Sequence, residues 1–201
     1  MVMGHYATAL IPYAYRENRS LAPFWVFLLA TQMLDFIMLA LVMIGVEEIA
    51  PANFFAASFR SMVVDMTYSH DIAPVIAWSL LFTVITLIAF KSTKLALIVL
   101  GLTVLHELMD LLVGFKHYWF GMPEQQDAAA FGFGLYTSAP VTGILIELAI
   151  CIGLLIWYFR RRATDGAPVL QRSKVTLAAV LVGFTAFLLL IANQSMIELV
   201  S

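Results

Sequence analysis

Charged residues are scarce in this chain. Asp, Glu, Lys and Arg make up 12% of its 201 residues, against roughly 25% in soluble domains. Apolar residues reach 62%, and the mean hydropathy is +0.93. So few charges do not suit the surface of a soluble domain of this length. The composition therefore predicts an integral membrane protein, with the lipid bilayer as its surroundings.

Cysteine is almost absent as well. The single cysteine, Cys151, excludes an internal disulfide and any metal or redox motif built from cysteine pairs. Because it lies within an apolar run, we expect a small buried side chain there. No basic stretch with interleaved aromatic residues occurs, so nucleic acid is not an expected partner. The segment before Arg16 lacks the positive charges that open a signal peptide, so we expect it to be retained.

Long apolar runs are plentiful. A helix of about 20 apolar residues crosses the hydrocarbon layer of a bilayer, and five runs approach or exceed this length. They span 21–46, 72–90, 95–115, 140–159 and 175–192. No internal repeat divides the chain. We therefore predict an all-α integral membrane protein, in which residues 1–201 form a single membrane-embedded domain with a bundle of five transmembrane helices.

A shorter apolar segment precedes the first run. The eleven residues from His5 to Tyr15 would rise about 16 Å as an α-helix, which reaches the middle of a bilayer. We therefore predict an N-terminal half-helix over residues 3–15. Its start is expected to be covered by protein, because a bare helix end is not tolerated in lipid.

The basic residues predict the orientation of the bundle. Arg60 and Lys116 fall on one side, and the other nine of the eleven fall on the opposite side. These nine are Arg16, Arg19, Lys91, Lys94, Arg160, Arg161, Arg162, Arg172 and Lys174. Because Lys and Arg are enriched in cytoplasmic loops, we expect the loop at 160–174 in the cytoplasm and the C-terminus outside.

Ionisable residues interrupt the apolar runs at similar depths. Counted from the cytoplasmic end of each run, Asp35, His106 and Glu147 lie about 20 Å up and His5 about 16 Å up. Asp110 lies one turn beyond His106 on the same helix face. An ionisable group at the bilayer centre costs roughly 2.5 kcal/mol or more. These groups therefore need partners, water or an ion.

Imidazoles and carboxylates that converge in a dry helical bundle suit a divalent metal. Zn²⁺ is the expected ion, with Fe²⁺ or Mn²⁺ as alternatives, and the expected ligands are His5, Asp35, His106 and Asp110. Without a metal, the same residues would suit a small proton- or cation-coupled transporter or channel. A haem held by His5 and His106 is a third hypothesis.

Short motifs follow one another in a fixed order over residues 4–115: G-H at His5, L-D at Asp35, S-H-D at His70 and H-E-L-M-D from His106 to Asp110. This order resembles the family of bacterial membrane-bound, metal-dependent hydrolases of the inner membrane. Members of that family carry an early His, L-P-D-I-D, T-H-S or S-H-S, and S-H-x-x-x-D. The chain departs from this pattern at Leu34, Ile37 and Asp71, which puts a second metal in doubt.

The resemblance implies a metal-dependent hydrolase of the bacterial inner membrane. We expect it to cleave an ester or phosphoester of a lipid-like, amphiphilic substrate from the external side, because an amphiphile can enter between helices. His70 is expected at the mouth of the site as a ligand or general acid/base. Glu147 is a candidate base, or a group that orients a ligating histidine. In the loops, we expect His117 and Glu47 to be solvated.

Overall fold

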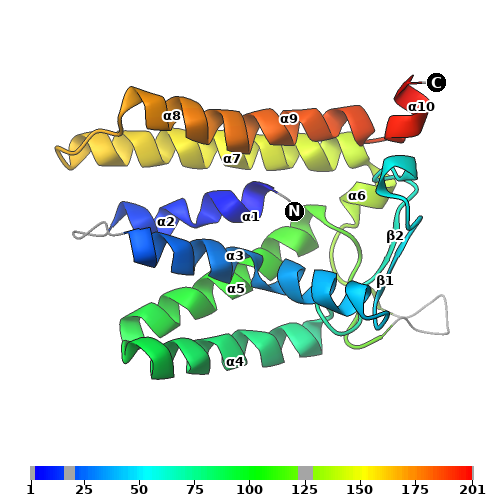
Figure 1. Cartoon of the computed structure of the whole chain (residues 1–201), viewed down its shortest axis with the longest axis horizontal. Coiled ribbons are helices and arrows are strands. Elements are labelled where there is room, and N and C mark those ends of the chain that lie inside the picture. The colour runs from blue at the N-terminus through cyan, green and yellow to red at the C-terminus, as the bar shows by residue number, and fades with distance from the viewer. Residues whose placement is uncertain (1–2, 16–20, 122–128, 201) are drawn as a thin grey trace.

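The computed structural model describes residues 3–15, 21–121 and 129–200, and these are mostly helical (Figure 1). Four long helices are α3 (Leu21–Met43), α4 (Ile72–Phe90), α5 (Thr93–Val113) and α7 (Pro140–Thr164). The fifth is composite: α8 (Gln171–Ala178), the π-helical turn η2 (Ala179–Gly183), α9 (Phe184–Leu188) and the 3-10 turn η3 (Leu189–Ile191) follow without a break. The predicted all-α class is confirmed.

These five helices are long and apolar enough to cross a membrane. Large apolar side chains face outward along them: Leu97 and Ile88, for example, are 59% and 71% exposed. Such a surface suits lipid and is uncommon on a soluble monomer. Each predicted run coincides with an observed helix, with ends that differ by up to about five residues: α3 ends earlier than predicted, at Met43, and α7 continues further, to Thr164.

The predicted helical segment over residues 3–15 is present as two short helices, α1 (Met3–Thr8) and α2 (Leu10–Ala14). Figure 1 shows them between two groups of long helices: α7 with α8 and α9 on one side, and α3, α4 and α5 on the other. Ala7 and Leu10 pack against Cys151 and Leu155 of α7. The predicted burial of Cys151 is confirmed.

The short elements gather at the end of the molecule where α3, α5 and η3 end (Figure 1). Strand β1 (Glu48–Ala50) pairs antiparallel with β2 (Val63–Asp65), with Ile49 opposite Val64. The 3-10 turn η1 (Phe54–Ala56) lies between these strands, and α6 (Leu135–Ser138) and α10 (Met196–Val200) complete this end. The backbone of His117 pairs with that of Phe131. These loops cover one end of the bundle.

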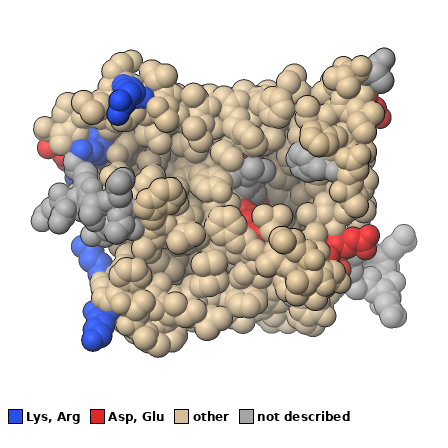
Figure 2. Space-filling model, in the orientation of Figure 1, with Lys and Arg blue, Asp and Glu red and all other residues tan. Residues whose placement is uncertain are grey.

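Basic side chains gather at the opposite end. On the face that Figure 2 shows, all blue atoms lie at the left, where α4 meets α5 and α7 meets α8 in Figure 1. The helix ends and loops there carry seven of the nine residues predicted on one side: Lys91, Lys94, Arg160, Arg161, Arg162, Arg172 and Lys174. Arg16 and Arg19 lie outside the described residues. Arg60 and Lys116 lie in loops of the other end, as the predicted topology requires.

Candidate metal centre

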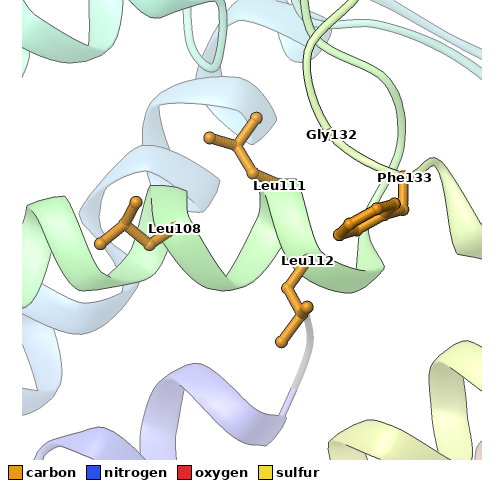
Figure 3. Close-up of a pocket in the computed structure, with 5 residues that line it drawn as sticks. All are labelled: Leu108, Leu111, Leu112, Gly132 and Phe133. Atoms are coloured by element: carbon orange, nitrogen blue, oxygen red, sulfur yellow. The ribbon is translucent and has the colours of Figure 1, made fainter.

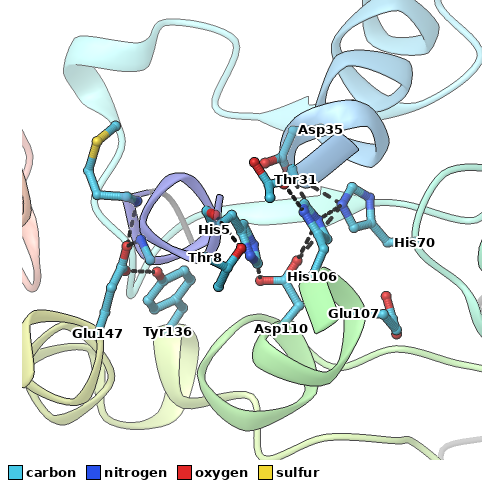
Figure 4. A network of polar contacts seen from close by, with 12 residues as sticks. His5, Thr8, Thr31, Asp35, His70, His106, Glu107, Asp110, Tyr136 and Glu147 are labelled. Atoms are coloured by element: carbon cyan, nitrogen blue, oxygen red, sulfur yellow. Dashed lines mark hydrogen bonds and ion pairs between the residues drawn. The ribbon is translucent and has the colours of Figure 1, made fainter. Parts of the chain in front are cut away.

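Four side chains converge between α3, the start of α4 and α5 (Figure 4). Asp35, His70, His106 and Asp110 each offer one ligand atom, and these atoms all lie within 4.8 Å of one another. Asp35 is partly exposed and the other three are buried. The protein thus contains a buried group of two carboxylates and two imidazoles that can hold a metal ion.

The separations suit ligands around one ion. The Nε2 atoms of His70 and His106 lie 3.3 Å apart. His106 Nε2 lies 3.3 Å from Asp110 Oδ2, and His70 Nε2 lies 3.4 Å from Asp35 Oδ1. The two remaining imidazole–carboxylate distances are 3.8 and 3.9 Å. Ligands held about 2.0–2.1 Å from a tetrahedral ion lie about 3.3 Å apart, so only small shifts would be needed.

The other ring nitrogen of each imidazole fixes its orientation. His106 Nδ1 donates to the backbone carbonyl of Thr31 at 2.7 Å. His70 Nδ1 lies 2.8 Å from Ser69 Oγ, whose own hydroxyl donates to Glu47 Oε2 at 2.9 Å. Ser69 Oγ is therefore the acceptor for His70 Nδ1–H. Both Nε2 atoms are left with lone pairs, which is the tautomer that a metal requires.

His5 lies beside this group. Its ring stacks on that of His106, with ring centroids 3.6 Å apart, so two of the predicted ligands lie side by side. Its Nε2 lies 3.2 Å from Asp110 Oδ1, whereas Asp110 Oδ2 faces the other two imidazoles. The four-residue group thus contains His70, which was predicted at the mouth of the site. His5, which was predicted as a ligand, contacts Asp110 at Oδ1, the carboxylate oxygen that faces away from the other two imidazoles. The parallel rings of His5 and His106 do not suit a haem, whose axial ligands lie on opposite sides of the iron.

Glu147 is buried at the N-terminal end of α1 and does not contact the four-residue group (Figure 4). Its Oε1 accepts the amide hydrogens of Met3 and Gly4 at 2.6 and 2.8 Å. Its Oε2 accepts the hydroxyl of Tyr136 at 2.5 Å. Because His5 follows in the same turn of α1, Glu147 positions His5 indirectly.

Two loop residues that were predicted to be solvated are buried, and those predictions are wrong. Glu47 accepts the amides of Tyr68 and Ser69, both at 2.8 Å, and so builds the turn that carries His70. His117 Nδ1 donates to the backbone carbonyl of His70 at 2.7 Å. Burial lowers the pKa of His117 to about 4. Both residues support His70 from loops, where helical depth gave no information.

Asp71, which stands where the resembled family has Ser, also holds a loop. Its carboxylate oxygens accept the amides of Tyr118 and Gly121 at 2.8 and 2.6 Å. Burial raises the pKa of Asp71. These bonds tie the segment that carries His117 to the start of α4. Asp71 therefore stabilises the loop next to the site.

Gly114 allows Asp110 its place at the end of α5. A Cβ at Gly114 would lie 2.8 Å from the backbone oxygen of Asp110 and 3.0 Å from its Oδ1. The Gly114 amide donates to that backbone oxygen at 2.7 Å. A larger residue would therefore push directly on the carboxylate that faces His106.

A cavity of about 420 Å³ adjoins the four-residue group. Asp35, His70 and Asp110 form part of its wall, and apolar side chains form most of the rest, among them residues of α3, β1, β2, α9 and η3. We call this cavity the chamber. Phe36, Leu39 and Phe184 line it and are 42%, 48% and 42% exposed, so its wall reaches the outer surface of the bundle.

A second hollow, of about 330 Å³, lies where the loop at Gly132 and Phe133 crosses α5 (Figure 3). Leu108, Leu111 and Leu112 form the rest of its lining. Gly132 lies so close to the Leu111 backbone that an added Cβ would meet its oxygen at 2.9 Å. With apolar side chains only, this hollow offers no chemical group for a reaction.

Comparison of the chain with protein-family models, with curated proteins and with solved structures finds no match. The resemblance to membrane-bound hydrolases therefore stays a prediction. Function has to be argued from the four convergent side chains and the chamber beside them.

Proposed function

We propose that this protein is a membrane-embedded, metal-dependent hydrolase. The observation that carries the proposal is the meeting of two imidazole lone pairs at 3.3 Å, flanked by two carboxylates. Two lone pairs repel each other unless a cation or a proton lies between them. A divalent ion among Asp35, His70, His106 and Asp110 satisfies all four groups at once, and the mixed nitrogen and oxygen ligands favour Zn²⁺, with Fe²⁺ or Mn²⁺ as alternatives.

The residues of the chain supply the rest of the site. When bound, the ion supplies Lewis acidity, which polarises an ester or phosphoryl oxygen and makes water more acidic. His5 contacts Oδ1 of Asp110, and Thr31 and Ser69 accept hydrogen bonds from the two imidazoles. Asp35 faces the chamber and has a 26% exposed side chain. Its contacts with His70 and His106 use Oδ1, so Oδ2 is the oxygen that would take a proton from attacking water.

The substrate that suits this arrangement is lipid-like. Apolar side chains line the chamber, and its wall reaches the surface between long apolar helices. An amphiphile can enter from the side and present its polar group to Asp35 and His70. We place the protein in a bacterial inner membrane, with the chamber in its external half, on the positive-inside distribution of Lys and Arg and on the family resemblance.

Metal analysis of the purified protein tests the proposal. We expect about one equivalent of Zn²⁺ in the wild type and none in His106→Ala, because a buried site that loses one of its four protein ligands binds far more weakly. Glu107→Gln is the matched control, since Glu107 neighbours His106 but points away from the group (Figure 4). It should keep its metal. A wild-type protein that binds no metal yet moves protons into liposomes would overturn the proposal in favour of a transporter.

A further inference from the structure

We propose that the scissile group of the substrate is an uncharged carboxylic ester on an apolar chain, and that phosphate esters are excluded. This inference rests on the proposed hydrolase function and narrows its substrate class. It follows from the sum of charges in the four-residue group and from the side chains that line the chamber. The charges and the lining side chains both belong to residues that the structure describes.

The charges of the site cancel once a divalent ion is bound. Asp35 and Asp110 contribute two negative charges, and the two imidazoles are neutral because each donates from Nδ1 and offers a lone pair at Nε2. A doubly positive ion brings the sum to zero. A carboxylic ester keeps this balance. A phosphodiester would add one negative charge and a phosphomonoester up to two, in a place where unpaired charge is costly.

The chamber has no cation with which to compensate an anionic substrate. None of the described residues that line it is Lys or Arg. The two basic residues at this end of the molecule, Arg60 and Lys116, are exposed and stand outside the lining. The side chain of Lys116 lies along Gly134, with its Cγ 2.8 Å from where a Cβ would be. Phosphate sites typically use Arg or Lys to meet the phosphate charge.

The apolar side chains that line the rest of the chamber favour a substrate with an apolar chain. The chamber volume, about 420 Å³, falls in the range of roughly 300–1,000 Å³ that is typical of small-molecule sites, which are mostly apolar with a few placed polar groups. Met38, Met62 and Met66 contribute flexible side chains to its wall, and methionine adapts to chains of varied shape. The polar groups Asp35, His70 and Asp110 lie together in this wall, as a single ester group requires.

The reaction balances without any further reactant. The oxygen of one water adds to the ester carbonyl carbon, and the bond from that carbon to the alcohol oxygen breaks. One water proton passes to Asp35 and then to the leaving alcohol oxygen. The products are a carboxylic acid, which ionises in solvent, and an alcohol. Because the proton stays within the site during the step, the sum of charges there does not change.

Two chromogenic substrates with the same chain test the inference. Para-nitrophenyl dodecanoate has an uncharged scissile ester, and dodecyl para-nitrophenyl phosphate has a singly charged phosphodiester. Both release the same phenolate. With Zn²⁺-loaded protein in an uncharged detergent, we expect hydrolysis of the carboxylic ester above the His106→Ala background and no such excess for the phosphodiester. Cleavage of the phosphodiester would overturn the inference and leave the hydrolase standing. Cleavage of neither by metal-loaded protein would overturn both.

A binding measurement that needs no turnover tests the chamber itself. A dodecanoate ester with a diazirine on its chain, cross-linked to metal-free protein in membranes, should label chamber residues. Met38→Trp narrows the chamber and should reduce this labelling by about tenfold, whereas Leu29→Trp should not. Leu29 lies nine residues earlier on α3, on the opposite face, and is 48% exposed. Equal labelling in both variants, or labelling spread over outward residues such as Ile88, would overturn the assignment of the chain to the chamber.

Discussion

The two imidazoles of the candidate metal centre are oriented by acceptors of different kinds. His106 uses a backbone carbonyl of α3, that of Thr31, which cannot be removed by a side-chain substitution. His70 uses the hydroxyl of Ser69, which is itself held by Glu47. Groups that orient a ligating histidine tune metal affinity almost as strongly as the ligands do. Substitution of Ser69 is therefore the simplest single-residue test of the site.

Ser69→Ala should weaken metal binding by about 10- to 100-fold. The change leaves His70 Nδ1 without its acceptor, so the ring loses its fixed tautomer and direction. Competition with a chelator of known affinity measures the effect. Ser79→Ala is the control, because Ser79 is also buried but its hydroxyl has no partner among the described residues. Equal metal affinities in the two variants would show that Ser69 does not orient His70.

Gly114→Ala should lower metal affinity by about tenfold, comparable with the loss of an orienting group. The added methyl group has to displace the Asp110 backbone or side chain, which lie 2.8 and 3.0 Å away. Gly101→Ala on the same helix is the matched control, since a Cβ there meets nothing within 4 Å. That control should stabilise α5 by about 1 kcal/mol or less. Metal titration of both variants measures the effect on the site, and thermal unfolding measures the effect on the stability of the helix.

At the scale of elements, α1 is held by one buried carboxylate. The first amides of a helix lack partners within the helix, and in α1 those of Met3 and Gly4 are met by Glu147. Without this acceptor, the partly buried amide of Met3 and the buried amide of Gly4 would lose their partner. The anchor fixes α1 against α7 and so holds His5 against Asp110. A contact on α7 thus sets the geometry of a site on α5.

Glu147→Ala should destabilise the protein by about 1–3 kcal/mol, the usual cost of unsatisfied buried donors. It should also increase hydrogen exchange in α1 more than in α4, which Glu147 does not contact. Glu147→Gln should lose less stability, because its amide oxygen can still accept hydrogen bonds from the amides of Met3 and Gly4. If exchange in α1 stays at the wild-type level in the Ala variant, the carboxylate does not anchor this helix.

The elements were largely predictable from the sequence, and the site only in part. Helical rise gives the depth of Asp35, His106 and Glu147, but not the direction in which each side chain points. Depth alone therefore groups Glu147 with the others, although it faces α1. The burial of Glu47 and His117 depends on loop folding, which no helical period encodes. The S-H-D motif was the signal for His70, yet its distance from His106 depends on the turn that Glu47 builds.

At the scale of the whole molecule, the two ends of the bundle differ. One end carries seven described basic residues: Lys91, Lys94, Arg160, Arg161, Arg162, Arg172 and Lys174. The other has the strands and loops that position His70 and close over the chamber, with strand residues such as Ile49 and Val64 in its wall. Because Lys and Arg are enriched in cytoplasmic loops, we expect the chamber in the external half of the membrane.

This orientation can be measured with single cysteines in a Cys151→Ala background. Thr164→Cys and Asn193→Cys place thiols at exposed positions near the two ends of the bundle. A membrane-impermeant maleimide applied to intact cells should label Asn193→Cys at once and Thr164→Cys only after permeabilisation. The reverse pattern would place the chamber in the cytoplasmic half. The substrate would then have to come from the inner leaflet, and the basic residues would lie outside, against the general rule for short loops. The metal centre would be unaffected by that outcome, because its ligands are fixed by contacts within the bundle.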